Sequence, residues 1–114
     1  MYGAILGDII GSVYERNNVK SKSFQILGDA SHFTDDTVMT IAVAESLMKN
    51  RNIMNCEISS EDITKECIVS SMQKWGHLYH NAGYGGRFLQ WLNNYEKEPY
   101  NSWGNGSAMR VSTT

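Results

Sequence analysis

Apolar residues recur at helical spacing along the chain, and no segment alternates apolar and polar residues for long enough to predict a β-strand. The first helical segment runs from Ala4 to Val13. Beside its apolar positions, Gly3, Gly7 and Gly11 recur every four residues and form one ridge of the predicted helix. Each glycine costs a helix roughly 1 kcal/mol relative to alanine, so we expect another helix or a ligand to approach this ridge closely.

A second helix is predicted from Asp35 to about Lys49, with apolar residues over more than half of its circumference. Such a helix is buried on most sides. The preceding polar stretch, residues 16–31, has no long apolar period and is predicted to be a loop. We expect Phe24, Ile26 and Leu27 to attach this loop to the rest of the protein.

Three further segments complete the predicted all-α fold. The cap-like sequence Ser59–Asp62 and an apolar stripe to about Gly76 predict a third helix. A glycine-rich break at Gly83–Gly86 precedes a short amphipathic helix, and a run of turn-forming residues leads into the start of another helix at Ala108–Val111. The predicted organisation is a single all-α domain over residues 1–114 with functional loops at the helix ends.

Composition narrows the choice of compartment and partner. Apolar residues make up 41% of the 114 positions, and the formal net charge is −2 with scattered cationic residues, which argues against nucleic acid or an anionic membrane as partner. The first apolar run has no basic flank and is interrupted by Asp8, so it predicts neither a signal peptide nor a membrane span. Cys56 and Cys67 are predicted to be thiols of a cytoplasmic protein.

The pair Asp35–Asp36, between Thr34 and Thr37, places oxygen ligands at the start of an apolar helix. Carboxylates and hydroxyls suit Mg²⁺, Mn²⁺ or Ca²⁺, whereas zinc sites usually draw on Cys and His. The alternative is that Thr34 or Asp35 caps the helix while a second acid interacts with the positive end of the helix dipole.

Two other predicted helix starts follow glycine-rich stretches, Gly83–Gly86 and Asn105–Ser107. Glycines allow backbone N–H groups to approach a ligand, and a helix N-terminus favours negative charge, so both stretches suit phosphate. Each is also consistent with an ordinary turn. The tryptophans Trp75, Trp91 and Trp103 are expected to be mostly core residues, and Trp103, within the second loop region, is the one placed to stack on a ligand.

Four blocks of the sequence together resemble the ADP-ribosylglycohydrolase family, the relatives of dinitrogenase reductase-activating glycohydrolase. The blocks are GAILGDIIGSVYE (Gly3–Glu15), FTDDT (Phe33–Thr37), GYGGRFLQWL (Gly83–Leu92) and PYNSWGNGSAMRVS (Pro99–Ser112). The resemblance implies an orthogonal all-α bundle with a binuclear Mg²⁺ or Mn²⁺ centre. It also implies cleavage of the C1″ glycosidic bond that joins ADP-ribose to a protein side chain or small acceptor.

The resemblance assigns roles to individual residues. Thr34, Asp35 and Asp36 match the family's first metal-binding segment, and Glu15 matches an acidic residue near the ribose, which implies a general base or a gate on substrate entry. Met109 and Arg110 would support the second glycine loop from behind. The residues implied to contact the pyrophosphate, ribose and phosphates of ADP-ribose are Gly83, Tyr84, Gly85, Gly86, Asn105, Gly106 and Ser107.

The resemblance covers the N-terminal part of the family domain, so we expect a partial, truncated domain. Relatives complete the binuclear centre with a later Asp-x-Asp-Thr/Ser segment, whereas this sequence ends at Thr114. We therefore expect a homo-oligomer or a complementary second chain to complete a hydrolase site. The alternative is a catalytically inactive module that binds ADP-ribose or docks on a protein as a regulator, inhibitor or decoy. The resemblance leaves open whether the acceptor is arginine, serine or a small molecule.

Overall fold

The computed structural model describes residues 1–54 and 61–111, with side chains described except at 50–54. All regular elements within this part of the chain are helices, which confirms the predicted all-α class. In chain order they are α1 (Tyr2–Gly11), α2 (Asp35–Met54), α3 (Glu61–Leu78), α4 (Gly86–Asn93) and α5 (Gly106–Met109).

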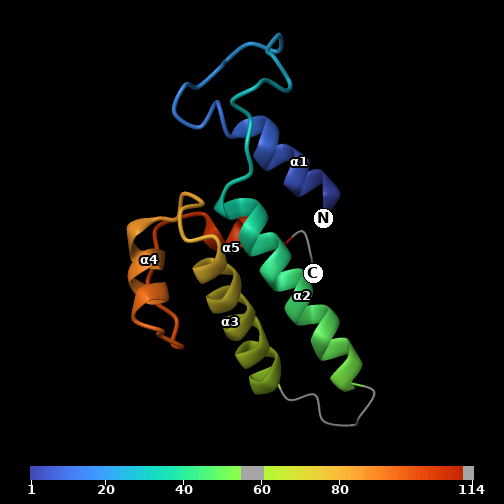
Figure 1. Ribbon diagram of the computed structural model, residues 1–114, viewed down its shortest axis with the longest axis vertical. Coiled ribbons are helices and arrows are strands. Elements are labelled where there is room, and N and C mark those ends of the chain that lie inside the picture. Colours follow the sequence, from blue (N-terminus) through green and yellow to red (C-terminus); the bar gives the residue numbers. More distant parts are fainter. Residues whose placement is uncertain (55–60, 112–114) are drawn as a thin grey trace.

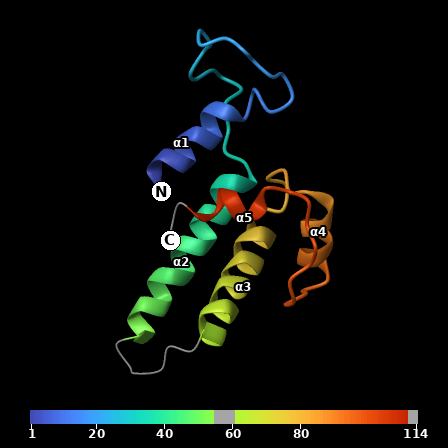
Figure 2. The same ribbon diagram turned by 180° about the vertical axis from the view of Figure 1, so that it is seen from behind.

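Helices α2 and α3 form an antiparallel pair at the centre of the molecule (Figure 1). Helix α1 packs against α2, and α4 packs against α3 on the opposite side. The short α5 lies beside the first turns of α2, as the reverse view also shows (Figure 2). The start of α2 is therefore the point where segments from both ends of the sequence meet.

The core joins the first half of α2 to the region around α4. Its members are apolar residues that are at most 7% exposed: Val38, Met39, Ala42, Tyr84, Phe88, Trp91 and Leu92. The predicted burial of α2 on most sides is confirmed for these turns, because Thr37, Thr40 and Ser46 are buried as well. Further along, Met48 is 66% exposed. The first turns of α2 are thus the part of this helix that the core buries.

The helix boundaries differ modestly from those predicted. Helix α1 ends at Gly11 rather than Val13, and α2 continues to Met54. Helix α5 begins at Gly106, because the backbone carbonyl of Asn105 already accepts hydrogen bonds from the amides of residues 108 and 109. The predicted cap at Ser59–Ser60 and the thiol of Cys56 lie outside the described residues, whereas Cys67 is a free thiol.

The loop between α1 and α2 is not attached to the body by the three residues predicted to do so. Phe24, Ile26 and Leu27 are 47%, 61% and 55% exposed. Phe24 instead packs edge-to-face on Tyr14 with ring centroids 5.5 Å apart, and the Tyr14 hydroxyl donates to the backbone carbonyl of Gln25 at 2.6 Å. The prediction was wrong because all three side chains are exposed, and Phe24 packs within the loop.

The glycine ridge of α1 faces open space rather than a closely packed helix. No heavy atom outside the local helix lies within 4 Å of the position that a Cβ would occupy at Gly3, Gly7 or Gly11. The expected close approach of another helix is therefore absent from the described part of the chain. Gly7 and Gly11 instead line a pocket with Asp36, which leaves a ligand as the expected neighbour of the ridge.

We predict that Gly76→Ala destabilises the protein. A Cβ at this buried position would lie 2.8 Å from Leu92 Cδ1 and 3.1 Å from Cδ2, and Leu92 is fully buried. Overpacking of this kind costs more than the helix propensity that alanine gains, so we expect a net loss of about 1–2 kcal/mol in urea unfolding. Gly3→Ala is the matched control, since its new methyl group meets open space. A Gly76→Ala variant as stable as the wild type would contradict the close α3–α4 packing.

A polar cluster joins α2 to α3. Glu45 accepts hydrogen bonds from Lys74 Nζ at 2.7 Å and Trp75 Nε1 at 2.5 Å, and it forms an ion pair with Lys49 at 2.8 Å. Hydrogen bonds from Lys49, Lys74 and Trp75 lower the pKa of Glu45 to about 2. Glu45 therefore connects two helices through a carboxylate that stays ionised in mild acid.

We predict a pH-dependent effect of Glu45→Gln. Because the folded-state pKa lies below the ordinary 4.5, the stabilisation is present in full above pH 4.5 and is lost as the pH falls toward 2. Both lysines are more than half exposed, and solvent screening limits the expected loss at pH 7 to about 1 kcal/mol. Urea unfolding at pH 7 and pH 3 should show the difference between variant and wild type shrinking in acid. An equal difference at both pH values would contradict an electrostatic contribution.

Candidate active site

The start of α2 is capped by a residue from α1. Asp8 is buried and accepts four hydrogen bonds from the first turn of α2. The backbone amides of Thr34 and Thr37 donate to its Oδ2 at 2.7 and 3.1 Å. The Thr34 hydroxyl donates to Oδ1 and the Thr37 hydroxyl to Oδ2, both at 2.5 Å. This carboxylate satisfies backbone donors that a helix normally leaves unpaired at its N-terminus.

The hydrogen bonds to Asp8 test the alternative that Thr34 or Asp35 is present only to cap the helix. In an ordinary cap, the Thr34 oxygen would accept from the amide of Asp36 or of Thr37, and the Thr37 amide here donates to Asp8. Thr34 accepts only a long contact of 3.4 Å from the amide of Asp36. Capping of α2 is therefore shared: Thr34 accepts from the Asp36 amide, and Asp8 accepts from the amides of Thr34 and Thr37.

Asp35 faces the two glycine-rich bends. The point where a Cβ of residue 83 would stand lies 3.6 Å from Asp35 Oδ1. A pocket of about 300 Å³ lies on this side of α2. Its lining combines Asp35 with both bends and the segment between them: Gly85, Gly86, Arg87, Phe88, Tyr100, Ser102, Trp103, Gly104, Asn105, Gly106, Met109 and Arg110.

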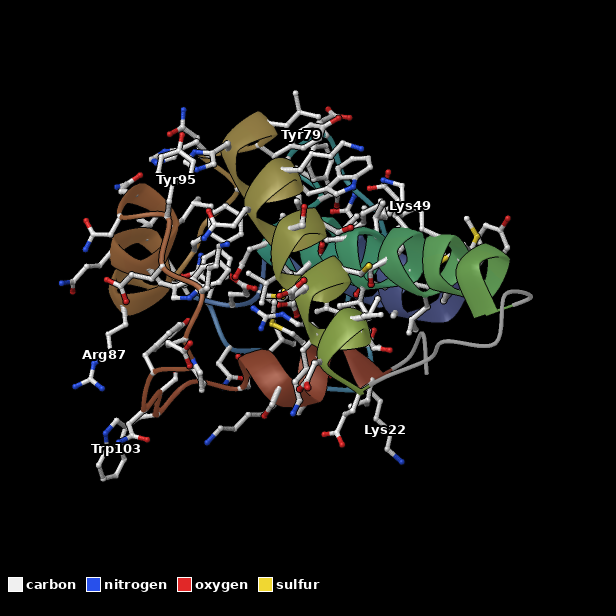
Figure 3. All side chains as sticks on the ribbon, turned by 90° about the horizontal axis from the view of Figure 1, so that it is seen from below. Lys22, Lys49, Tyr79, Arg87, Tyr95 and Trp103 are labelled. Atoms are coloured by element: carbon white, nitrogen blue, oxygen red, sulfur yellow. The ribbon has the colours of Figure 1, made fainter. Side chains whose placement is uncertain are left out.

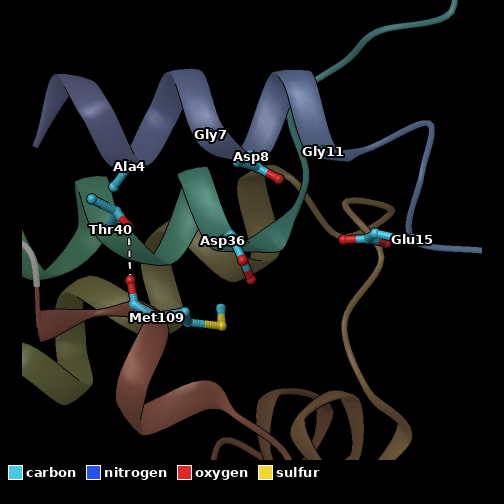
Figure 4. A pocket seen from close by; sticks show the side chains of 8 residues that line it. All are labelled: Ala4, Gly7, Asp8, Gly11, Glu15, Asp36, Thr40 and Met109. Carbon is cyan, nitrogen blue, oxygen red and sulfur yellow. Dashed lines mark hydrogen bonds between the residues drawn. The ribbon is translucent and has the colours of Figure 1, made fainter. Parts of the chain in front are cut away.

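Asp36 faces a second pocket, of about 320 Å³, which it shares with Glu15 (Figure 4). Figure 4 shows Gly7 and Asp8 on the α1 side and Asp36 with Thr40 opposite them on α2. The floor is closed by Met109, whose carbonyl accepts a hydrogen bond of 3.4 Å from the Thr40 hydroxyl. Asp35 and Asp36 thus line different pockets, and Met109 lines both pockets.

The start of α2 carries negative charge that Arg110 offsets only in part. Burial, and then the charge of Asp36, raise the pKa of Asp35 to about 6. Burial and the charges of Asp8 and Glu15 also raise the pKa of Asp36, while Arg110 opposes this rise. Carboxylates destabilised in this way are stabilised by a bound cation, because its positive charge favours their ionised form.

The donor set fits one part of a divalent cation site. Two half-buried carboxylates and a threonine hydroxyl are the hard oxygen ligands that Mg²⁺ and Mn²⁺ prefer. Within residues 1–54 and 61–111, however, no three His, Cys, Asp or Glu side chains come together in an arrangement that would hold a metal ion. Asp35, Asp36 and Thr34 would therefore supply some of the ligands, and water, substrate or other residues would supply the rest.

The first glycine bend exposes backbone rather than side chains. Gly83 has a φ of +104°, which favours glycine, and Gly85 and Gly86 have no heavy atom within 4 Å of a Cβ position. Tyr84 lines neither the Asp35 pocket nor the Asp36 pocket. Its ring packs on Phe88 in the core, and burial raises the pKa of its hydroxyl. The structure thus brings Gly85 and Gly86 to Asp35 but places the Tyr84 ring elsewhere.

The second bend reaches the same pocket through Asn105 and Gly106, with Arg110 beneath it. The Arg110 guanidinium packs over the Phe88 ring at 5.4 Å, and its Nη2 lies 3.3 Å from the Cβ position of Gly106. Ser107 lines a larger neighbouring groove of about 1120 Å³. Trp103 is 96% exposed and stands at the outer edge of the molecule (Figure 3), at the rim of this groove and of the Asp35 pocket.

Sequence reasoning missed Asp8. The signal was present, because a buried carboxylate within an apolar helical run needs hydrogen-bond donors or a cation. From the sequence alone, Asp8 counts only as a polar residue that interrupts an apolar run. None of the described helices has the length and apolar character needed to cross a membrane.

Comparisons with known proteins support one family. No curated protein and no solved structure gives a match to this chain. The family model of ADP-ribosylglycohydrolase matches residues 1–114. This match spans the whole sequence and agrees with the all-helical fold, so the chain belongs to the ADP-ribosylglycohydrolase family.

Proposed function

We propose that this chain contributes to the hydrolysis of the glycosidic bond between ADP-ribose and a protein side chain or small acceptor, with Mg²⁺ or Mn²⁺ as the cation. Family membership supports the general activity. The observation that carries the finer proposal is the position of Asp35 and Asp36, which lie between a pocket lined by both glycine bends and a pocket lined by Glu15.

Different residues of this chain would bind the diphosphate and the cation. The backbone of Gly85, Gly86 and Gly106, together with the Arg110 guanidinium, would hold the diphosphate, since exposed amides and a fixed cation suit phosphate oxygens. A cation held by Asp35 and Asp36 would add positive charge next to the ribose hydroxyls.

Glu15 would act as a general base toward the attacking water. In this hydrolysis, a water oxygen forms a bond to C1″ while the bond from C1″ to the acceptor breaks. The acceptor leaves with the electron pair of that bond and takes up a proton, which balances the proton that the water loses. Glu15 would accept the proton of the water, because its carboxylate faces the pocket that Asp36 lines. The alternative role, a gate on substrate entry, is also compatible with its exposed position before a loop.

Completion of the site is part of the proposal. Two carboxylates and one hydroxyl hold Mg²⁺ weakly unless further ligands or substrate phosphates contribute. We propose that residues beyond the described ones provide the remaining ligands, whether from the same polypeptide, from a second copy or from a different chain. In keeping with this, we propose that residues 1–114 form a partial domain of the family.

The test is release of ADP-ribose from peptides ADP-ribosylated on arginine or serine, in Mg²⁺ or Mn²⁺, with the mass of the assembly measured in solution. We expect cation-dependent release that is suppressed by EDTA. Absence of release at every assembly state would contradict the hydrolase proposal for this chain.

A second candidate function is binding of ADP-ribose without turnover. It is favoured by the Asp35 pocket, because the glycine bends and Arg110 that line it do not need a complete set of metal ligands. Calorimetry with ADP-ribose, with and without Mg²⁺, tests this candidate. Binding in both conditions together with no release would support it, whereas no heat in either condition would exclude it.

A further inference from the structure

Asp8 links the glycine-ridged helix to the acidic pair although it is distant from the pair in sequence. Its carboxylate accepts two backbone amides and two hydroxyls from Thr34 and Thr37, which flank Asp35 and Asp36 on either side. Asp8 is 9% exposed, so each of these hydrogen bonds is shielded from water. Both ends of the four-residue segment are therefore attached to one carboxylate of α1.

Loss of this carboxylate has a specific structural consequence. With Asp8 gone, the Thr34 oxygen, which already accepts a long hydrogen bond from the Asp36 amide, becomes an acceptor for the Thr37 amide as well. Helix α2 would then keep a cap and most of its stability. The Thr34 hydroxyl, however, would lose the oxygen to which it donates and would rotate toward its own helix, and the α1 anchor of the segment would be lost.

We propose that Asp8 is a positioning residue for the cation site: it accepts the amides and hydroxyls of Thr34 and Thr37 at the start of α2 and thereby fixes Thr34, Asp35 and Asp36 for ligand binding. This inference rests on the proposed function, which alone assigns a cation to these residues. Asp8 acts through Thr34 and Thr37 and needs no contact with the cation itself.

The first experiment needs no metal. In NMR spectra of the full chain, we expect Asp8→Asn to shift the amide resonances of residues 34–37 and to change the χ1 rotamer of Thr34, as read from three-bond couplings. Asp62→Asn is the matched control, because it removes the same charge from an exposed position in the first turn of α3. Unchanged resonances and an unchanged Thr34 rotamer in Asp8→Asn would overturn the proposal.

The second experiment measures binding of Mn²⁺ alone by electron paramagnetic resonance. We expect Asp8→Asn to raise the Mn²⁺ dissociation constant about tenfold or more, as loss of a residue that orients metal ligands typically does. Thr37→Ser keeps the hydroxyl that donates to Asp8 and should bind Mn²⁺ like the wild type. Thr37→Val removes that hydroxyl and should bind more weakly. Equal Mn²⁺ affinity in all of these variants would overturn the proposal.

The two experiments separate failure of this inference from failure of the proposed function. If the wild type binds no Mn²⁺, the cation role fails, and with it the functional part of this inference, while the NMR result still decides whether Asp8 positions the segment. If Asp8→Asn loses helix content by circular dichroism, the Thr37→Ser and Thr37→Val pair decides the matter, since it alters a single hydrogen bond.

Discussion

Asp35→Asn combined with Asp36→Asn should reduce cation-dependent release of ADP-ribose by about 10³-fold or more. A cation acting as a Lewis acid supplies several kcal/mol of transition-state stabilisation, and about 1.4 kcal/mol corresponds to a factor of ten in rate. Asparagine preserves the size of each side chain while removing the charge that holds the cation. The measurement is kcat/KM for ADP-ribosylated peptide with Mg²⁺ or Mn²⁺.

Stability provides the control for this variant. Burial and the charge of Asp36 raise the pKa of Asp35 to about 6. A raised carboxyl pKa means that ionisation is unfavourable in the folded state, so stability falls as the pH rises from about 4 to about 6. At pH 7, Asp35→Asn should therefore be at least as stable as the wild type. Retained Mg²⁺-dependent hydrolysis in the double variant would contradict the assignment of these ligands, and a large loss of stability would contradict the proposed destabilisation of the ionised carboxylates.

Glu15→Gln should lower kcat by about 10²–10⁴-fold, the usual contribution of general base catalysis. Glutamine cannot take the proton of the attacking water, yet it keeps the size of the side chain at an exposed position. Binding of ADP-ribose, measured by calorimetry, should stay near the wild-type value because the diphosphate contacts lie in the other pocket.

The comparison that isolates Glu15 is Glu66→Gln, which removes one exposed acid from the middle of α3 and should change neither value. An unchanged kcat in Glu15→Gln would eliminate the role as base. A changed KM with an unchanged kcat would instead favour the role of Glu15 as a gate on substrate entry.

The helices could be predicted because their apolar periodicity is a local property of the sequence. Apolar residues at helical spacing between Asp35 and Lys49, Val38 and Ala42 among them, indicated a buried helix, and these two residues form the core with Met39 and the α4 region. The same reasoning failed for Phe24, Ile26 and Leu27, since an apolar side chain in a loop carries no information about which surface it contacts. Phe24 packs against Tyr14, which lies in the same loop.

The acidic pair and the glycine bends were recognisable from residue type and spacing, but their arrangement was not. Asp8 and Thr37 are 29 positions apart, and only the packing of α1 against α2 brings them together. For the same reason the sequence could not show that Asp35 and Asp36 serve different pockets. Nor could it show that the Tyr84 ring, between two exposed glycines, belongs to the core.

The most direct test of the account is the location of bound Mn²⁺, read from paramagnetic broadening in NMR spectra of the full chain with ADP-ribose present. The alternative acidic position is Glu61–Asp62 at the start of α3, which lies at the far end of the antiparallel pair (Figure 1). Helix α2 has 20 residues, so these two positions are about 30 Å apart at a rise of about 1.5 Å per residue. We predict that substoichiometric Mn²⁺ broadens residues 34–37 and 106–109 first and leaves residues 61–65 sharp. Broadening centred on the start of α3, or no selective broadening, would contradict a cation site at the start of α2.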